Sequence, residues 1–136
     1  MRWLVLAIGL ALASGAAADA RAEPPAKGLF GAAATPSAGP AAAIGGYARG
    51  CLAGAAALPI DGAGYQAMRL SRHRRFAHPA LVDFVERLAS GLRAEGHPGL
   101  LVGDLAQPRG GPMTSGHRSH QSGLDADIWY LPAPRE

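Results

Sequence analysis

An amphipathic segment from Pro79 to about Glu95 limits the folds open to this chain of 136 residues. Pro79 suits the first position of a helix, and Gly96 suits the residue just past its end. Five apolar side chains share one face of that helix: Leu81, Phe84, Val85, Leu88 and Leu92. Burying five such side chains is worth at most about 7–15 kcal/mol. Because a helix buries such a face only against another element, the pattern predicts a sheet beside it.

The other apolar segments are short and suit strands and turns. Residues 44–58 hold four glycines, at 45, 46, 50 and 54, which argue against a helix and for turns around short strands. Alternation suits a strand at 66–70, and we expect further strands at 99–105 and 124–131. We predict an α+β fold in which the helix packs on one face of a small antiparallel sheet. Aromatic residues make up only 6% of the chain, and Ala and Gly inflate its apolar share, so we expect no large core.

The N-terminus has the layout of an export signal. Arg2 precedes an uncharged run from Trp3 to Ala18, and small residues then stand where a signal peptidase reads. The run has 16 residues rich in Ala and Gly, whereas a membrane span needs about 20 strongly apolar ones. We therefore expect residues 1–20 to be a cleaved signal peptide, which leaves no stable membrane anchor. Residues 21–43 are rich in Pro, Gly, Ala and Ser and predict an extended arm before a domain at 44–136.

The loop between the last two predicted strands holds the residues that suggest chemistry. Within eleven residues it contains two imidazoles and two carboxylates: His117, His120, Asp125 and Asp127. Such groups bind divalent metals, and the histidines favour zinc. If residues 124–131 form a strand, both aspartates lie on one face, so the spacing does not choose between them. Solvent-exposed loop histidines beside an aspartate that caps a turn, with no metal site, explain the same residue pattern equally well. The zinc motif H-E-x-x-H is absent, because Arg118 takes the place of its glutamate.

Four blocks closely resemble the penicillin-insensitive murein endopeptidases: GLFGAA at 28–33, IGGYARGCLAGAAALPIDG at 44–62, YQAMRLSRHRRFAHP at 65–79 and GLLVGDLAQPRGGPMTSGHRSHQSGLDADIW at 99–129. The resembled enzymes are periplasmic zinc peptidases of Gram-negative bacteria, within the wider group of lysostaphin-type, D-Ala-D-Ala and hedgehog-like metallopeptidases. The resemblance implies hydrolysis of the D-alanyl to meso-diaminopimelyl cross-links of peptidoglycan, in the periplasm and with Zn²⁺ as cofactor. Residues 72–77 depart from the usual family run, which has Asn after the first Arg and an aromatic-Gly pair before the His.

The resemblance also implies a ligand set. The wider group binds its metal through H-x6-D and a distal H-x-H. His120 and Asp127 match the first part, which selects Asp127 over Asp125. His117 matches a further histidine that lines the metal site in these endopeptidases. We therefore expect His117, His120 and Asp127 to bind the metal.

The distal H-x-H has no counterpart here. In the group it carries the last zinc ligand and a catalytic histidine, and no histidine follows Asp127 in this sequence. The family chain is roughly twice as long, which better suits a complete enzyme domain. We therefore expect an N-terminal fragment whose fold is incomplete at its C-terminal side and which is inert by itself. The alternative is a non-catalytic peptidoglycan-binding module. Cys51, the only cysteine, matches a family cysteine that forms a disulfide near the distant C-terminus.

Several polar residues have two interpretations each. Arg109, in the segment PRGGP, either holds a substrate carboxylate with the flanking glycine amides or is an exposed turn arginine. Asp104 either accepts a hydrogen bond from a ligand imidazole or caps a turn. Arginines at 69, 72, 74 and 75 form a basic cluster without interleaved stacking aromatics. We therefore expect no nucleic-acid partner, and the cluster suits the carboxylates of murein peptides.

The remaining conspicuous side chains have structural interpretations. His78 precedes the predicted helix and His97 follows it, at positions where polar side chains satisfy backbone groups. Phe84 and Trp129 are most simply core residues.

Overall fold

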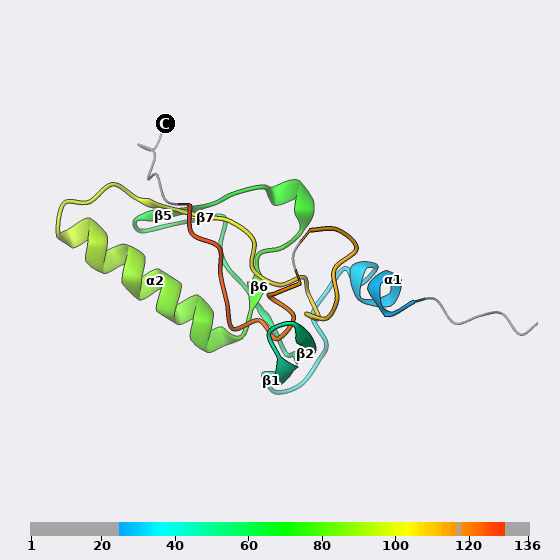
Figure 1. Cartoon of the computed structure of the whole chain (residues 1–136). Coiled ribbons are helices and arrows are strands. Elements are labelled where there is room, and N and C mark those ends of the chain that lie inside the picture. Colours follow the sequence, from blue (N-terminus) through cyan, green and yellow to red (C-terminus); the bar gives the residue numbers. More distant parts are fainter. Residues whose placement is uncertain (1–24, 117, 130–136) are drawn as a thin grey trace, which may run out of the picture.

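A computed structural model describes residues 25–116 and 118–129, and its elements are labelled in Figure 1. The predicted signal peptide at 1–20, residues 21–24 of the predicted arm, His117 and residues 130–136 lie outside the described residues. The elements in chain order are α1 (Ala26–Gly31), β1 (Ala42–Gly46), β2 (Arg49–Ala53), β3 (Ala56–Ala57), β4 (Asp61–Gly62), β5 (Tyr65–Ala67), the 3-10 turn η1 (Leu70–Arg72), β6 (Phe76–Ala77), α2 (Pro79–Ala94) and β7 (Leu100–Val102).

The strands form three small sheets, and the fold is α+β as predicted. β1 and β2 make an antiparallel hairpin, β3 pairs antiparallel with β6, and β4 pairs antiparallel with β5. One pair, β5 with β7, is parallel. Helices α1 and α2 lie on opposite sides of the described structure, with the sheets between them (Figure 1). The short strands at 44–58 and the strand within 99–105 are confirmed.

Helix α2 begins and ends close to the predicted residues. Its first residue is Pro79, and the Nδ1 of His78 accepts a hydrogen bond from the Ala80 amide at 3.2 Å. Past its end, Gly96 has φ +84°, which glycine adopts without steric cost. The capping role expected of His78 is confirmed.

The face that α2 buries differs from the predicted one. Its buried residues are Val82, Val85 and Ala89. Phe84 is 53% exposed and Leu88 is 38% exposed, so the prediction that Phe84 is a core residue was wrong. The buried face of α2 is rotated from the predicted one because a neighbouring turn packs against it. A Cβ placed on Gly64 in that turn would lie 2.5 Å from the carbonyl oxygen of Ala89. Such close backbone approach favours the side of the helix with a small residue.

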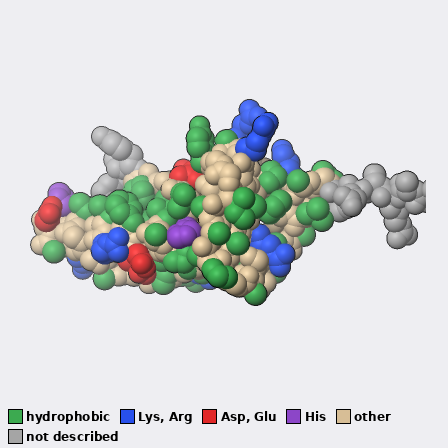
Figure 2. Space-filling view, turned by 90° about the horizontal axis from the view of Figure 1, so that it is seen from below, with side chains coloured by type: hydrophobic (Ala, Val, Ile, Leu, Met, Phe, Trp, Pro, Cys, Tyr) green, Lys and Arg blue, Asp and Glu red, His purple; other side chains and the backbone are tan. Residues whose placement is uncertain are grey.

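The core lies between α2 and the β4–β5–β7 sheet. It consists of Leu58, Tyr65, Ala77, Val82, Val85, Ala89, Val102 and Leu105. Outside this core, apolar side chains are interspersed with charged ones on the face seen from below in Figure 2, including the part that contains α2. Trp129 is also more exposed than a core residue, and Arg69 lies 5.2 Å from its ring, so its assignment to the core was wrong as well. No helix in the described part of the chain is long and apolar enough to cross a membrane.

Three further predicted segments differ in detail. The strand expected at 66–70 is β5 at Tyr65–Ala67, followed by η1. Residues 124–129 form no strand, although the amide of Trp129 donates to Leu101 at 2.9 Å and a single bridge joins Val102 to Ile128. The expected extended arm contains α1, which packs through Phe30 against Gly111. Short side chains and glycines at 110–111 allow this contact, and no pattern within residues 21–43 indicates it.

Candidate metal centre

The loop from Gln107 to Gly123 is held by its own buried polar groups. The amide of Gly110 donates to Gln107 at 2.8 Å, and the Gln107 side chain donates back to the Gly110 carbonyl at 2.7 Å. The amide of Gly111 donates to the Gln121 carbonyl at 2.9 Å. Both glutamine side chains are buried, where a polar group is costly unless it is hydrogen-bonded. Residues 107–116 and 118–123 of this loop therefore have a defined arrangement, although they form no strand or helix.

Gln121 fastens this loop to the β1–β2 hairpin. Its Nε2 donates to the carbonyls of Ala48 and Arg118, each at 3.0 Å, and its Oε1 accepts from the Gly50 amide at 3.3 Å. Its own amide donates to Tyr47 at 3.0 Å. Sequence reasoning missed this residue. The one signal available was an amide side chain directly after His120 in a stretch of small polar residues.

Among the candidate ligands that the structure describes, His120 is the most enclosed. Its side chain is 1% exposed, and its backbone has φ +66°, a conformation that residues other than glycine rarely adopt. Strained backbone of this kind clusters at functional sites. The carboxylate of Asp125 lies 2.8 Å from Nδ1 of the ring and also accepts from the His120 amide at 3.1 Å. Two contacts to one carboxylate fix the orientation of the imidazole.

Asp127 lies on the opposite side of the same ring. Its Oδ1 is 3.5 Å from Nε2 of His120, which is longer than the roughly 2.7–2.9 Å of a charge-assisted hydrogen bond. Nitrogen and oxygen ligands of one tetrahedral zinc ion lie about 3.4 Å apart, given bond lengths near 2.0–2.2 Å. The observed separation therefore fits two ligands of one ion.

The two aspartates have different places, which spacing alone did not reveal. Asp125 contacts Nδ1 and Asp127 contacts the Nε2 side of His120. Histidines that bind metal through one ring nitrogen usually donate the other to a carboxylate or carbonyl. These contacts are compatible with Asp125 as the residue that orients the ring and with Asp127 as a metal ligand, and the ligand set stays a prediction.

A third ligand does not come from the described residues. Within 25–116 and 118–129, no group of three or more His, Cys, Asp or Glu side chains is arranged to hold a metal ion. His117, the third predicted ligand, lies outside that part of the chain. The donor set of imidazole and carboxylate nevertheless suits zinc.

Asp104 connects the two sides of the loop. Its side chain is 1% exposed, and Oδ2 lies 2.9 Å from Nη1 of Arg72 and 3.0 Å from Nη1 of Arg74. Arg74 in turn donates to the Ser115 carbonyl at 2.7 Å, two residues before His117. The carbonyl of Asp104 accepts from the Asp127 amide at 2.9 Å. Asp104 is therefore linked to Asp127 directly and to the loop before His117 through Arg74.

The predicted basic cluster is not one surface. Arg74 is 8% exposed, and Arg72 shares with it the carboxylate of Asp104. Arg75 donates to the Leu58 carbonyl at 2.6 Å. Arg72, Arg74 and Arg75 therefore bind groups of the protein itself, and the cluster does not form a single exposed basic face.

Arg109 lies apart from this arrangement. Its side chain is exposed, and its Nε donates to the Thr35 carbonyl at 3.3 Å. The flanking amides of Gly110 and Gly111 are already donated to protein carbonyls, as described above. The sequence analysis offered these amides, together with Arg109, as donors to a substrate carboxylate. Because both amides already donate to protein carbonyls, they are not available for that role.

Comparison with known proteins identifies the family. Residues 43–136 match the sequence profile of the penicillin-insensitive murein endopeptidases. The chain belongs to this family. A penicillin-insensitive murein endopeptidase from Haemophilus influenzae is 52% identical over 91 residues, which are 67% of this chain and 32% of that protein. Family members from Yersinia enterocolitica and Klebsiella pneumoniae are 50% and 46% identical over 101 residues, which are 74% of this chain and 37% of each relative. The chain thus aligns with about a third of the length of these murein endopeptidases.

Proposed function

We propose that this chain carries the first ligands of a zinc-dependent murein endopeptidase, which hydrolyses D-alanyl to meso-diaminopimelyl cross-links of peptidoglycan. The observation that carries the proposal is the pair formed by His120 and Asp127, whose Nε2 and Oδ1 atoms lie 3.5 Å apart. Membership of the murein endopeptidase family supports the substrate class. His117 is the proposed third ligand, and we propose the periplasm as the compartment.

The chain's own residues have distinct tasks in this proposal. When bound, a zinc ion would supply a Lewis acid and would activate a water molecule for attack. His120 would hold the metal through Nε2, because the carboxylate of Asp125 lies against Nδ1 and would accept the proton of that nitrogen. Asp127 supplies a negative oxygen ligand, and the exposed Arg109 side chain remains a proposed substrate contact. Loop positions are fixed by Asp104 and Gln121 before any ligand arrives.

The sequence also agrees with a reaction that forms no acyl-enzyme. The chain has a single lysine, Lys27, and Pro24 stands three residues before it. It therefore lacks the S-x-x-K motif of penicillin-binding proteins. An enzyme without a nucleophilic serine of this kind gives penicillin nothing to acylate.

A second candidate is a peptidoglycan-binding module without catalysis. Family membership supports the same substrate for such a module, and within the residues that the structure describes no group of three His, Cys, Asp or Glu side chains is arranged to hold a metal ion. One experiment separates the two. The chain is incubated with cross-linked muropeptides and zinc, with and without a chelator, and is also sedimented with isolated sacculi.

Release of monomers that the chelator abolishes, and that Asp127→Asn also abolishes, supports an endopeptidase and contradicts the expectation that this chain is inert by itself. Sedimentation with sacculi and no release supports the binding module. If neither occurs, while the chain binds zinc, both functions are contradicted for this chain alone. Glu95→Gln, at the exposed end of α2, is the control variant that keeps the wild-type behaviour.

Export is tested separately. We propose that the segment 1–20 directs the chain across the inner membrane and is removed. The N-terminal sequence of protein recovered from a periplasmic extract is expected to begin near Arg21. Recovery of chains that retain Met1 contradicts this part of the proposal.

A further inference from the structure

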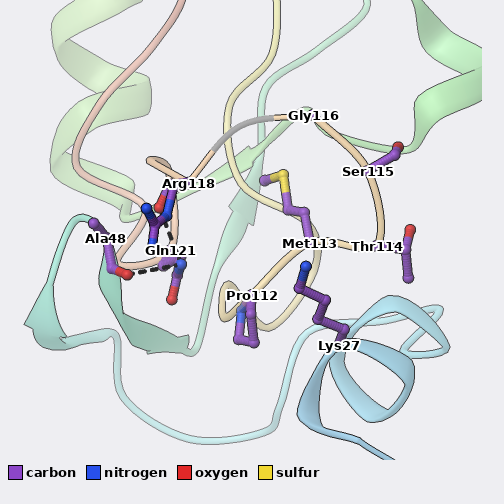
Figure 3. A pocket seen from close by; sticks show the side chains of 9 residues that line it. All are labelled: Lys27, Ala48, Pro112, Met113, Thr114, Ser115, Gly116, Arg118 and Gln121. Atoms are coloured by element: carbon purple, nitrogen blue, oxygen red, sulfur yellow. Dashed lines mark hydrogen bonds between the residues drawn. The ribbon is translucent and has the colours of Figure 1, made fainter.

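A cavity of about 320 Å³ lies beside the metal loop, between three parts of the chain (Figure 3). One wall is α1, the second is the turn between β1 and β2, and the third consists of residues 112–116 with Arg118 and Gln121. The described lining residues are Lys27, Ala48, Pro112, Met113, Thr114, Ser115, Gly116, Arg118 and Gln121. This volume is at the lower end of those that hold small ligands in proteins.

The walls of the cavity are joined by specific contacts. Gln121 bonds the loop to Ala48 in the hairpin turn, as the dashed lines in Figure 3 show. Helix α1 reaches the loop through Phe30, whose ring occupies the space that a Cβ on Gly111 would fill. A Cβ on Gly31 would lie 2.9 Å from Cγ2 of Thr114. The cavity is therefore set by packing between segments that lie far apart in the sequence.

The described charged side chains that line the cavity are all basic. Lys27 and Arg118 are the charged side chains among the described lining residues, and none of those residues is acidic. Both cationic side chains are exposed and so can reach a ligand that enters from solvent. Lys27 comes from α1 and Arg118 from the far side of the loop, and they approach the cavity from different walls (Figure 3). Two cations around an otherwise neutral cavity favour an anion.

The position of the cavity suggests which anion. Arg118 stands between His117 and His120 in the sequence, and Ser115 and Gly116 line the cavity just before His117. A peptide that reaches the metal loop therefore passes close to these cations. Arg109 does not serve this purpose as well, because the glycine amides beside it are already donated to Gln107 and Gln121.

We propose that this cavity binds a free carboxylate of a peptide, with Lys27 and Arg118 as its cationic contacts. This inference rests on the proposed function, under which the peptide is a murein stem bearing carboxylates. Lysine acts here as a mobile point charge, and arginine offers two parallel N–H donors to the carboxylate. Arg118→Lys is therefore expected to bind more weakly than the unchanged chain and more tightly than Arg118→Ala.

The test measures binding without metal. The full chain is titrated calorimetrically, in the presence of a chelator, with a disaccharide tetrapeptide that carries free carboxylates and with the same compound after carboxyl amidation. Lys27→Ala and Arg118→Ala are each expected to weaken binding of the free acid about 3- to 10-fold, and the double variant more. The amidated compound is expected to bind weakly to every variant. Arg87→Ala, on the exposed side of α2, is the charge-matched control and keeps the wild-type affinity.

Several results overturn the inference. They are equal affinity for the acid and the amidated compound, an unchanged affinity in the double variant, or displacement of the peptide by acetate at equal concentration, which indicates a site for small anions only. Because both side chains are exposed, the variants are expected to unfold at the wild-type temperature, which circular dichroism checks. The proposed function is tested by a different measurement, the zinc-dependent cleavage of muropeptides. If cleavage is absent while the chain still binds the free acid more tightly than the amidated compound, the proposed function fails and this inference stands.

Discussion

Nε2 of His120 and Oδ1 of Asp127 lie 3.5 Å apart, on the side of the imidazole that faces away from Asp125. The two residues are brought together by unlike means. His120 is placed by a strained backbone at φ +66° within the loop, whereas Asp127 exchanges backbone hydrogen bonds with Gly103 and Asp104 beside the sheet. Backbone hydrogen bonds therefore hold Asp127 beside the sheet, and a supported loop holds His120, so that the fold itself sets the separation of these two predicted ligands.

Asp125 is expected to tune zinc affinity without binding the ion. Asp125→Ala removes the carboxylate 2.8 Å from Nδ1 of His120, so the ring loses its preferred tautomer and orientation. We expect zinc affinity to fall about 10- to 100-fold, as measured by competition with a chromophoric chelator. Asp83→Ala, on the exposed side of α2, is the control and leaves the affinity unchanged. An Asp125→Ala chain with wild-type affinity contradicts the orienting role.

Asp104 is expected to stabilise the fold strongly. Asp104→Ala leaves the guanidinium of Arg74 buried without the carboxylate 3.0 Å away, and an uncompensated buried charge costs about 3–5 kcal/mol. Urea denaturation followed by circular dichroism measures the loss in the free energy of unfolding. The double variant Asp104→Ala with Arg74→Met is expected to recover part of that loss, because it removes the unpaired charge. No recovery in the double variant contradicts this explanation.

The contact between Gly64 and α2 is expected to tolerate no side chain. Gly64→Ala places a Cβ 2.5 Å from the Ala89 carbonyl oxygen and forces alanine to φ +89°. We expect the free energy of unfolding to fall by at least about 2 kcal/mol. Gly91→Ala is the matched control, since a Cβ there meets nothing within 4 Å, and alanine in a helix gains about 0.5–1 kcal/mol over glycine. Equal effects of the two substitutions contradict the close packing.

The stability of the fold is expected to fall at high pH because of Tyr65. Burial raises the pKa of its phenol above the usual value of 10.0, and Glu86, which accepts its hydrogen bond at 3.3 Å, raises it further. The unfolded chain therefore loses this proton more readily than the folded chain. The contribution is complete below pH 10.0 and is lost as the pH rises through the raised pKa. Denaturant titrations above pH 9 and up to pH 12 are expected to show a smaller decline for Tyr65→Phe than for the wild type.

The sequence predicted elements better than it predicted their packing. Pro79 and Gly96 mark α2 because helix ends depend on local backbone chemistry. The buried face was wrong because the 3.6-residue period does not say which partner the helix meets, and here Gly64 approaches Ala89. The larger Phe84 and Leu88 fit the period equally well and lie on the exposed side.

The candidate site shows the same division. His120 and the two aspartates are conspicuous in the sequence. Asp125 and Asp127 are two residues apart, so a strand pattern places both on the same face and does not distinguish them. The fold shows that Asp125 contacts Nδ1 of His120 and that Asp127 lies near Nε2. Gln121 was missed because its partners, Ala48 and Gly50, are more than seventy residues away. Long-range hydrogen bonds of this kind leave no local pattern.

The most direct test of the metal centre is the crystal structure of the chain grown with zinc, with data collected at the zinc absorption edge. We predict an anomalous peak about 2.0–2.2 Å from both Nε2 of His120 and Oδ1 of Asp127, with Nδ1 still bonded to Asp125. The peak is expected to disappear in Asp127→Ala crystals grown under the same conditions. Zinc bound elsewhere, or a wild-type structure in which these two side chains turn away from each other, contradicts the account.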